Sequence, residues 1–184
     1  MEFVAGEPLY QFCDNRNLSI KERLQIFIQV CEAVHTAHQI KVVHRDLKPS
    51  NIVINQNKTP KLLDFGIAKL LTADENSGTV TSLGIMTPAY ASPEQANGKN
   101  VTTATDVYSL GVILYELLTG QMPYKFDSNN PNKMAQVISS TEPQKPSLVV
   151  YDQWSVVSKE LKNPKSKIQN PKSLRGDLDN IVLM

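Results

Sequence analysis

The sequence predicts an α+β fold that is mostly helical and contains one short β-hairpin. Three observations predict it: a capped helical stretch after Ser19, two short apolar runs at 52–54 and 61–63 around a polar turn, and a stretch at 105–118 that is apolar on nearly every side. The length of 184 residues favours one domain with a core of its own.

Ser19 opens the first long predicted helix. Glu22 follows three residues later, and this spacing is typical of a capping box, in which the two side chains satisfy backbone N–H groups at the helix start. The residues that then recur on one face at helical spacing are Leu24, Phe27, Cys31, Val34 and His38. We expect this helix to pack into the core.

The middle of the chain reads as a hairpin followed by a long loop. The segment NQNKTP between Ile54 and Lys61 is rich in turn-forming residues, so the two apolar runs beside it are predicted to pair as strands. Residues 72–105 carry many Thr, Ser, Gly and Asn residues without a sustained period. A loop of this length inside a compact domain is usually functional.

The second half begins with the most apolar helix of the chain. The stretch 105–118 has only Asp106 and Glu116 as charged residues, which indicates a buried helix, and Gly120 is expected to end it. Periodicity fades over 127–175, which we interpret as irregular. The final residues, GDLDNIVLM, predict the beginning of another helix.

Composition places the chain among ordinary globular proteins, with 41% hydrophobic and 20% charged residues. The net charge of +1 supplies no overall attraction to nucleic acid or to an anionic membrane. Cys13 and Cys31 form no spaced framework, which favours a reduced, cytoplasmic setting. The chain begins without a secretory signal, and its longest apolar run, 110–118, is too short to span a bilayer. We therefore expect no nucleic-acid partner and no membrane segment in this chain.

Three motifs carry the chemistry, and they occur in a fixed order: His44 to Asn51 (HRDLKPSN), Asp64-Phe65-Gly66, and Ser92-Pro93-Glu94. Together they resemble the catalytic loop, the metal-binding triplet and the end of the activation segment of protein kinases. The Asp64-Phe65-Gly66 triplet alone would be weak evidence for a protein kinase. Three motifs in this order, with an apolar helix after them, are strong evidence. The resemblance implies the C-terminal lobe of a kinase domain, similar to bacterial serine/threonine kinases.

The resemblance assigns the reaction to four residues. Asp46 would accept the proton of the attacking hydroxyl, and Lys48 would bring its charge to the transferring phosphate of ATP. Asn51 and Asp64 are oxygen ligands of the kind that suits Mg²⁺ bound jointly to substrate phosphates. The predicted hairpin explains the spacing, because it folds Asp64 back beside Asn51.

Lys48 also indicates which type of protein kinase the chain resembles, because kinases with lysine at this position phosphorylate serine or threonine in protein substrates. Thr87 matches the threonine that packs near the catalytic aspartate and lysine in such kinases. The residue before it is usually glycine in the family and is Met86 here, which leaves the substrate groove less defined.

The resemblance also implies regulatory and structural residues. Arg45 matches the arginine that holds a phosphorylated activation loop, and the candidate phosphoacceptors are Thr79, Thr81 and Ser82. Glu94 matches a glutamate whose arginine partner lies in helices beyond residue 184. The resemblance gives His44, Phe65 and Asp106 structural roles. The Asp106 carboxylate would accept backbone N–H bonds from the catalytic loop.

The first residues, MEFVAGEPL, resemble the hinge between the two kinase lobes. Met1 would occupy the gatekeeper position, backbone groups of Glu2 and Val4 would pair with adenine, and Val53 would form the floor under the ring. A different interpretation, a metal face of Cys31, His35 and His38 in the first long helix, is disfavoured because two of the three lie on the apolar stripe.

On this resemblance the chain has three parts. Residues 1–18 would form the hinge and first helix, residues 19–124 the core of the lobe with the catalytic loop and activation segment, and residues 125–184 an irregular insertion and the end of the lobe. The sequence contains no Gly-x-Gly-x-x-Gly loop, and the strand lysine and helix glutamate of complete kinases would precede the hinge. We therefore expect an incomplete domain, inactive by itself.

Two further functions stay open at this stage. The chain could be a catalytically dead kinase fragment that acts as a binding module. A small-molecule phosphotransferase with a related catalytic loop is a third possibility, against which Lys48 and the Ser92-Pro93-Glu94 string argue.

Overall fold

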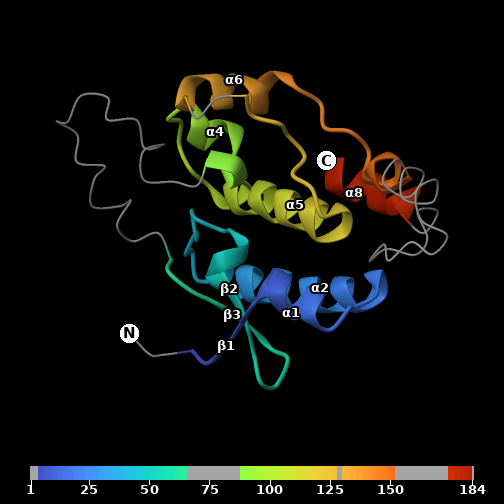
Figure 1. Cartoon of the computed structure of the whole chain (residues 1–184). Helices are drawn as coiled ribbons and strands as arrows, with labels where there is room; N and C mark the ends of the chain where they lie inside the picture. Colours follow the sequence, from blue (N-terminus) through green and yellow to red (C-terminus); the bar gives the residue numbers. More distant parts are fainter. Residues whose placement is uncertain (1–3, 66–87, 128–129, 152–173, 184) are drawn as a thin grey trace.

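The computed structural model describes residues 4–65, 88–127, 130–151 and 174–183 (Figure 1). The fold is α+β and mostly helical, as predicted, with one small sheet. In chain order the elements are β1 (Gly6–Pro8), α1 (Leu9–Asn15), α2 (Ile20–Gln39), the 3-10 turn η1 (Pro49–Asn51), β2 (Ile52–Asn55), β3 (Pro60–Leu62), the 3-10 turn η3 (Pro88–Tyr90), α4 (Pro93–Ala96), α5 (Thr103–Thr119), α6 (Pro131–Ser140) and α8 (Asp177–Leu183).

The sheet is antiparallel, in the order β1-β2-β3. The predicted hairpin is confirmed, with Ile52 opposite Leu62 and Ile54 opposite Pro60. Strand β1 adds a third strand, and it requires glycine at position 6. A Cβ atom on Gly6 would lie 2.5 Å from both the Ile54 carbonyl oxygen and a methyl of Val53. The segment expected to be the hinge is thereby held against β2.

Helix α2 begins as predicted. The Ser19 hydroxyl accepts a hydrogen bond from the Glu22 backbone N–H, and the Glu22 carboxylate accepts one from the Ser19 N–H. The buried stripe, however, runs through Ile26, Phe27, Val30 and Val34, while Leu24, Cys31 and His38 are only partly buried. The stripe is broader than the sequence suggested, because α5 and β3 both contact this helix.

Helix α5 is the centre of the fold. Thr102 caps its start, and Gly120 ends it in the left-handed conformation with φ of 70°. It contacts α2 on one side, as predicted, and also contacts η3 and α8 (Figure 1). Among the described residues, no helix is long and apolar enough to cross a membrane.

Two stretches that we predicted as irregular contain helices. Within 72–105 the structure has η3, α4 and the first residues of α5, and within 127–175 it has α6 and a helical turn at 146–151. Helix α6 forms because the Asn130 side chain caps it, Pro131 starts it, and it packs against α4. Met134, Ala135 and Ile138 are its buried residues, and their spacing was the signal that the sequence analysis missed. The final helix, α8, is confirmed.

A buried arginine joins three helical segments. The Arg23 side chain is in the interior, where its guanidinium group donates to the carbonyl oxygens of Leu18 and Leu117 and to the Asp14 carboxylate at 3.0, 3.3 and 2.9 Å. Leu117 lies near the end of α5 and Asp14 near the end of α1, so one side chain satisfies groups of both helices.

We expect Arg23→Met to lower the free energy of unfolding by about 2 to 4 kcal/mol, because buried hydrogen bonds from a charged donor are lost. Chemical denaturation monitored by circular dichroism measures the change. Arg16→Met is the control, since the Arg16 guanidinium pairs with Glu7 at the surface and should matter less. Equal losses in the two variants would contradict the role assigned to Arg23.

Candidate active site

The catalytic-loop segment, residues 44–51, is held by one buried carboxylate. Asp106, in the first turn of α5, is 1% exposed. Its two oxygens accept the backbone N–H groups of His44 at 2.8 Å and Arg45 at 2.9 Å. This is the contact that the sequence analysis expected of Asp106, and it places the start of the loop on the central helix.

Asp106 has a third partner that sequence reasoning missed. The Nε2 atom of His38, near the end of α2, lies 2.7 Å from the same Asp106 oxygen that accepts the His44 N–H. Since a carboxylate only accepts, the His38 ring must carry its proton on Nε2. The signal for this contact in the sequence is a histidine on an otherwise apolar stripe, which the sequence analysis considers only as a metal ligand.

His44 connects the loop to the strand that leads to Asp64. Its Nε2 atom lies 2.9 Å from the Leu63 carbonyl oxygen, and its ring lies 4.6 Å from the Phe65 ring between centroids. Burial lowers the pKa of His44, although the Asp106 carboxylate acts in the opposite direction. A neutral ring protonated on Nε2 satisfies the geometry, because Nδ1 can then accept the Asp46 backbone N–H at 3.4 Å. The residues on both sides of Asp64 are thereby tied to the loop.

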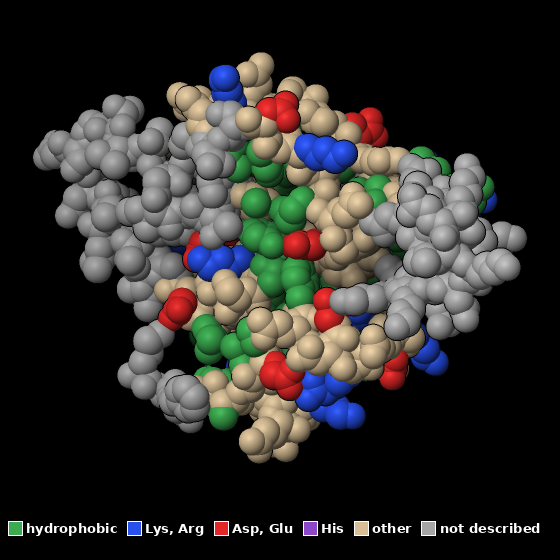
Figure 2. All heavy atoms as spheres, viewed as in Figure 1, with side chains coloured by type: hydrophobic (Ala, Val, Ile, Leu, Met, Phe, Trp, Pro, Cys, Tyr) green, Lys and Arg blue, Asp and Glu red, His purple; other side chains and the backbone are tan. Residues whose placement is uncertain are grey.

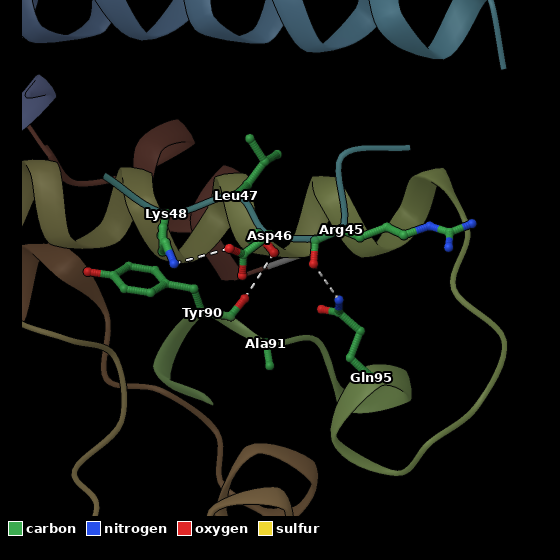
Figure 3. A pocket seen from close by; sticks show the side chains of 8 residues that line it. Arg45, Asp46, Leu47, Lys48, Tyr90, Ala91 and Gln95 are labelled. Atoms are coloured by element: carbon green, nitrogen blue, oxygen red, sulfur yellow. Dashed lines mark hydrogen bonds and ion pairs between the residues drawn. The ribbon is translucent and has the colours of Figure 1, made fainter. Parts of the chain in front are cut away.

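Asp46, Lys48 and Asn51 meet within this loop, and Figure 3 shows the first two of them. The Lys48 Nζ atom lies 3.0 Å from an Asp46 carboxylate oxygen. The Asn51 side-chain amide donates to the Asp46 carbonyl at 2.9 Å and to its carboxylate at 3.3 Å. The lysine charge and the amide N–H stabilise the anionic form of Asp46, which is the form that can accept a proton.

Asn51 and Asp64 have the chemistry that a magnesium ion requires. Because the Asn51 amide nitrogen is directed at Asp46, the amide oxygen is the atom left to bind a cation. Asp64 is exposed and has φ of 52°, and the adjacent Leu63 N–H donates to the Asn51 carbonyl at 2.8 Å. Within the described residues no cluster of three or more His, Cys, Asp or Glu side chains exists that could enclose a metal. The pair therefore fits an ion that takes its other ligands from phosphate and water.

The short helix α4 is hydrogen-bonded to the catalytic-loop segment. Ser92 and Gln95 form a capping box, and the Gln95 side-chain amide donates to the Arg45 carbonyl at 2.9 Å (Figure 3). Sequence reasoning missed Gln95, although a serine followed three residues later by glutamine is the pattern of a capping box. The Arg45 side chain itself extends away from Asp46 (Figure 3).

Glu94 has a partner within the chain. Its carboxylate accepts the Thr105 hydroxyl at 2.6 Å, beside Asp106. The pKa of Glu94 is lowered: burial acts to raise it, but hydrogen bonds from Thr105, the backbone and Ser92 together outweigh burial. The carboxylate is therefore ionised at neutral pH.

At the expected hinge, β1 pairs with β2, and Val53 is opposite Pro8 in the sheet. The Val53 side chain is 8% exposed, and Val4 is partly exposed. Several predicted site residues lie outside the described part of the chain: Met1, Glu2, Gly66, Thr79, Thr81, Ser82, Met86 and Thr87.

The hollow at the loop is small. Arg45, Asp46, Leu47 and Lys48 line it together with Tyr90, Ala91, Gln95 and Ser109, and its volume is about 10 Å³, room for about one water. A larger groove, about 540 Å³, lies between α5 and α8 and is mostly apolar. Apolar side chains are also visible at the middle of the face viewed in Figure 2. Of the predicted site residues that the structure describes, only Glu94 lines the larger groove.

The order of the motifs is the one expected of a protein kinase domain, and comparison with known proteins agrees. The protein kinase domain family matches residues 1–172, and the chain belongs to this family. Serine/threonine-protein kinase PknB of Mycolicibacterium smegmatis is 39% identical over 97% of the chain, and the protein of that name from Mycobacterium tuberculosis is 38% identical over the same share. A probable serine/threonine-protein kinase PknB of Lactococcus lactis is 43% identical over 70% of the chain.

The chain covers 29% of the length of the two mycobacterial relatives and 20% of the third. The match to the protein kinase domain over residues 1–172 confirms the expected family.

Proposed function

We propose that this chain supplies the catalytic loop and metal ligands of a protein kinase that transfers the γ-phosphate of ATP to serine or threonine hydroxyls. The observation that carries the proposal is the grouping of Asp46, Lys48 and Asn51 on a loop held by the buried carboxylate of Asp106. Phosphoryl transfer depends mainly on positioning and on charge stabilisation, and this loop offers both.

Each residue has a role in the proposal. Asp46 accepts the proton of the acceptor hydroxyl, and the Lys48 ammonium, 3.0 Å from Asp46, stabilises negative charge on the transferred phosphoryl oxygens. Asn51 and Asp64 would hold Mg²⁺, which neutralises charge on the phosphates of bound ATP. Val53 and the backbone of Glu2 and Val4 would contact adenine.

The choice of serine and threonine over tyrosine rests on Lys48 and on the similarity to proteins named as serine/threonine-protein kinases. We assign Arg45 the role of pairing with a phosphorylated Thr79, Thr81 or Ser82, and Thr87 a place near Asp46. The partners are ATP and proteins that present Ser or Thr. A cytoplasmic setting follows from the use of ATP and from Cys13 and Cys31, neither of which forms a disulfide.

The test compares the 184-residue chain with a protein that joins it to a complete ATP-binding lobe and the helices that follow in related kinases. We expect the joined protein to phosphorylate serine and threonine peptides in the presence of Mg²⁺, and to leave a tyrosine peptide unmodified. The chain alone should bind Mg-ATP weakly and transfer no phosphate, because it has no Gly-rich phosphate loop.

Calorimetry with Mg-ATP and a radiolabel transfer assay distinguish the outcomes. Micromolar ATP binding and transfer by the chain alone would contradict its dependence on a second lobe. Absence of transfer by the joined protein, if it is folded, would leave a binding module as the better assignment.

A further inference from the structure

The Gln95 side-chain amide has a hydrogen-bond partner at each end. Its oxygen accepts the Ser92 backbone N–H at 3.1 Å, which is one half of the capping box of α4. Its nitrogen donates to the Arg45 carbonyl at 2.9 Å. Because an amide oxygen accepts and an amide nitrogen donates, the bond from Ser92 fixes which end of the amide faces Arg45. The side chain is buried, so these two bonds replace the water that the amide gives up on folding.

Arg45 is held at this position in an unfavourable backbone conformation. Its φ is 67°, in the left-handed region that residues other than glycine rarely adopt. Two contacts support that conformation from opposite sides. Asp106 accepts the Arg45 N–H at 2.9 Å, and Gln95 donates to the Arg45 carbonyl. Since Asp106 belongs to α5 and Gln95 to α4, the loop backbone at Arg45 is held between two helices.

The Gln95 contact acts on the peptide group that directly precedes Asp46. The Arg45 carbonyl and the Asp46 N–H belong to one planar unit, which also contains the Asp46 Cα atom. Gln95 holds the carbonyl end at 2.9 Å, whereas the N–H end lies 3.4 Å from His44 Nδ1, which is long for a hydrogen bond. Gln95 therefore makes the shorter of the two contacts that set the tilt of this plane. A change of tilt moves the Asp46 Cα atom and the carboxylate with it.

Gln95 contacts the backbone of Arg45, and the Arg45 side chain extends in another direction. Figure 3 shows the guanidinium group directed away from Asp46, while the Gln95 amide nitrogen points at the Arg45 carbonyl oxygen. The effect of Gln95 on the loop is therefore separate from the pairing with phosphate that we assign to the Arg45 guanidinium group.

A role in α4 alone does not account for glutamine at this position. Glutamate also forms a capping box with a serine three residues earlier, and Ser19 and Glu22 do so at the start of α2. What glutamine adds is an N–H donor, and the structure directs that donor at the catalytic loop. A carboxylate at position 95 would instead bring a second acceptor up to the Arg45 carbonyl.

We propose that Gln95 is a positioning residue for the general base: by donating to the Arg45 carbonyl it fixes the peptide group before Asp46, and with it the direction of the Asp46 carboxylate. This inference rests on the proposed kinase activity, in which Asp46 accepts the hydroxyl proton. It gives Gln95 an effect on turnover and none on the binding of ATP or of the acceptor.

The experiment compares two variants of Gln95 with one control in the joined kinase. Gln95→Glu keeps the capping box and loses the donor, whereas Gln95→Met loses both with little change of shape. Asn97→Leu is the matched control, because the Asn97 amide lies at the end of the same helix and donates to the Pro93 carbonyl at 2.7 Å, outside the catalytic loop.

Steady-state kinetics at pH 8, well above the usual pKa of glutamate, supplies the first readout. We expect both Gln95 variants to lower kcat about tenfold, as for the loss of one hydrogen bond that holds a reacting group. The KM values for the peptide and for Mg-ATP should stay unchanged. Asn97→Leu should leave kcat and both KM values unchanged.

A second readout does not need activity. Backbone amide exchange at residues 45 and 46 of the 184-residue chain should become about tenfold faster in both Gln95 variants and stay unchanged in Asn97→Leu. If the wild-type joined protein transfers no phosphate, the proposed function fails, and amide exchange at these two residues alone decides whether Gln95 positions the loop.

The result that would overturn the inference is wild-type kcat with wild-type exchange in Gln95→Glu, because Gln95 would then only complete the capping box. A rise in either KM without a fall in kcat, or faster exchange spread over the whole chain, would also overturn it. If Gln95→Met does not fold, Gln95→Glu decides the question, since it keeps the hydrogen bonds that start α4.

Discussion

Replacing Asp46 by asparagine is expected to lower kcat for phosphoryl transfer by at least about a hundredfold in the joined kinase, the usual cost of losing a general base. The amide cannot accept the hydroxyl proton. The substitution also removes the negative charge that lies 3.0 Å from the Lys48 ammonium. The ammonium therefore loses its fixed position beside the reacting groups. Steady-state kinetics with a serine peptide at saturating Mg-ATP measures the change.

The control for Asp46→Asn is Glu142→Gln, the same carboxylate-to-amide change at an exposed residue. Thermal unfolding of both variants separates chemistry from folding, because Asp46 lies on a loop and its replacement should leave the midpoint almost unchanged. Wild-type turnover in Asp46→Asn would remove Asp46 from the role of base.

Asp106→Asn is expected to produce the largest loss of stability, about 3 to 5 kcal/mol, as when one partner of a buried charged network is removed. Asp106 accepts the His44 and Arg45 N–H groups and the His38 ring with two oxygens. Asparagine keeps only one oxygen, and its amide nitrogen would face a donor. Urea denaturation of the 184-residue chain measures the free energy of unfolding.

Asp177→Asn is the matched control, because Asp177 also lies in the first turn of a helix but is exposed. Amide exchange at His44 and Arg45 supplies a local readout, which should become faster in Asp106→Asn well below the unfolding transition. If the two variants lose stability equally, Asp106 does not hold the catalytic loop.

Local patterns in the sequence were sufficient for several elements. The Ser19 and Glu22 capping box, the 52–62 hairpin and the apolar helix that ends at Gly120 depend on residues a few positions apart. Their geometry follows from backbone hydrogen bonding within each segment. The motif residues Asp46, Lys48 and Asn51 were identified through the resemblance to protein kinases, and one short loop carries all three.

Other elements were missed because their stability comes from neighbours. Strand β1 has only three residues and exists because Gly6 lets it approach β2 closely. Helix α6 lies in a stretch rich in Asn, Pro and Ser, and packing against α4 supports it. Intrinsic propensity is a weak guide in such segments, since tertiary contacts override it.

The sequence by itself determined the family, the order of its three motifs and the two helices that form the core. The tertiary structure alone decided which polar groups meet across the core: His38 with Asp106, Arg23 with the Leu117 carbonyl, and Tyr10 and Tyr90 with Glu116. These partners are 26 to 106 residues apart, and no local spacing encodes such pairs. Burial is the physical reason that they form, because a polar group taken from water must find a partner on whichever element is packed against it.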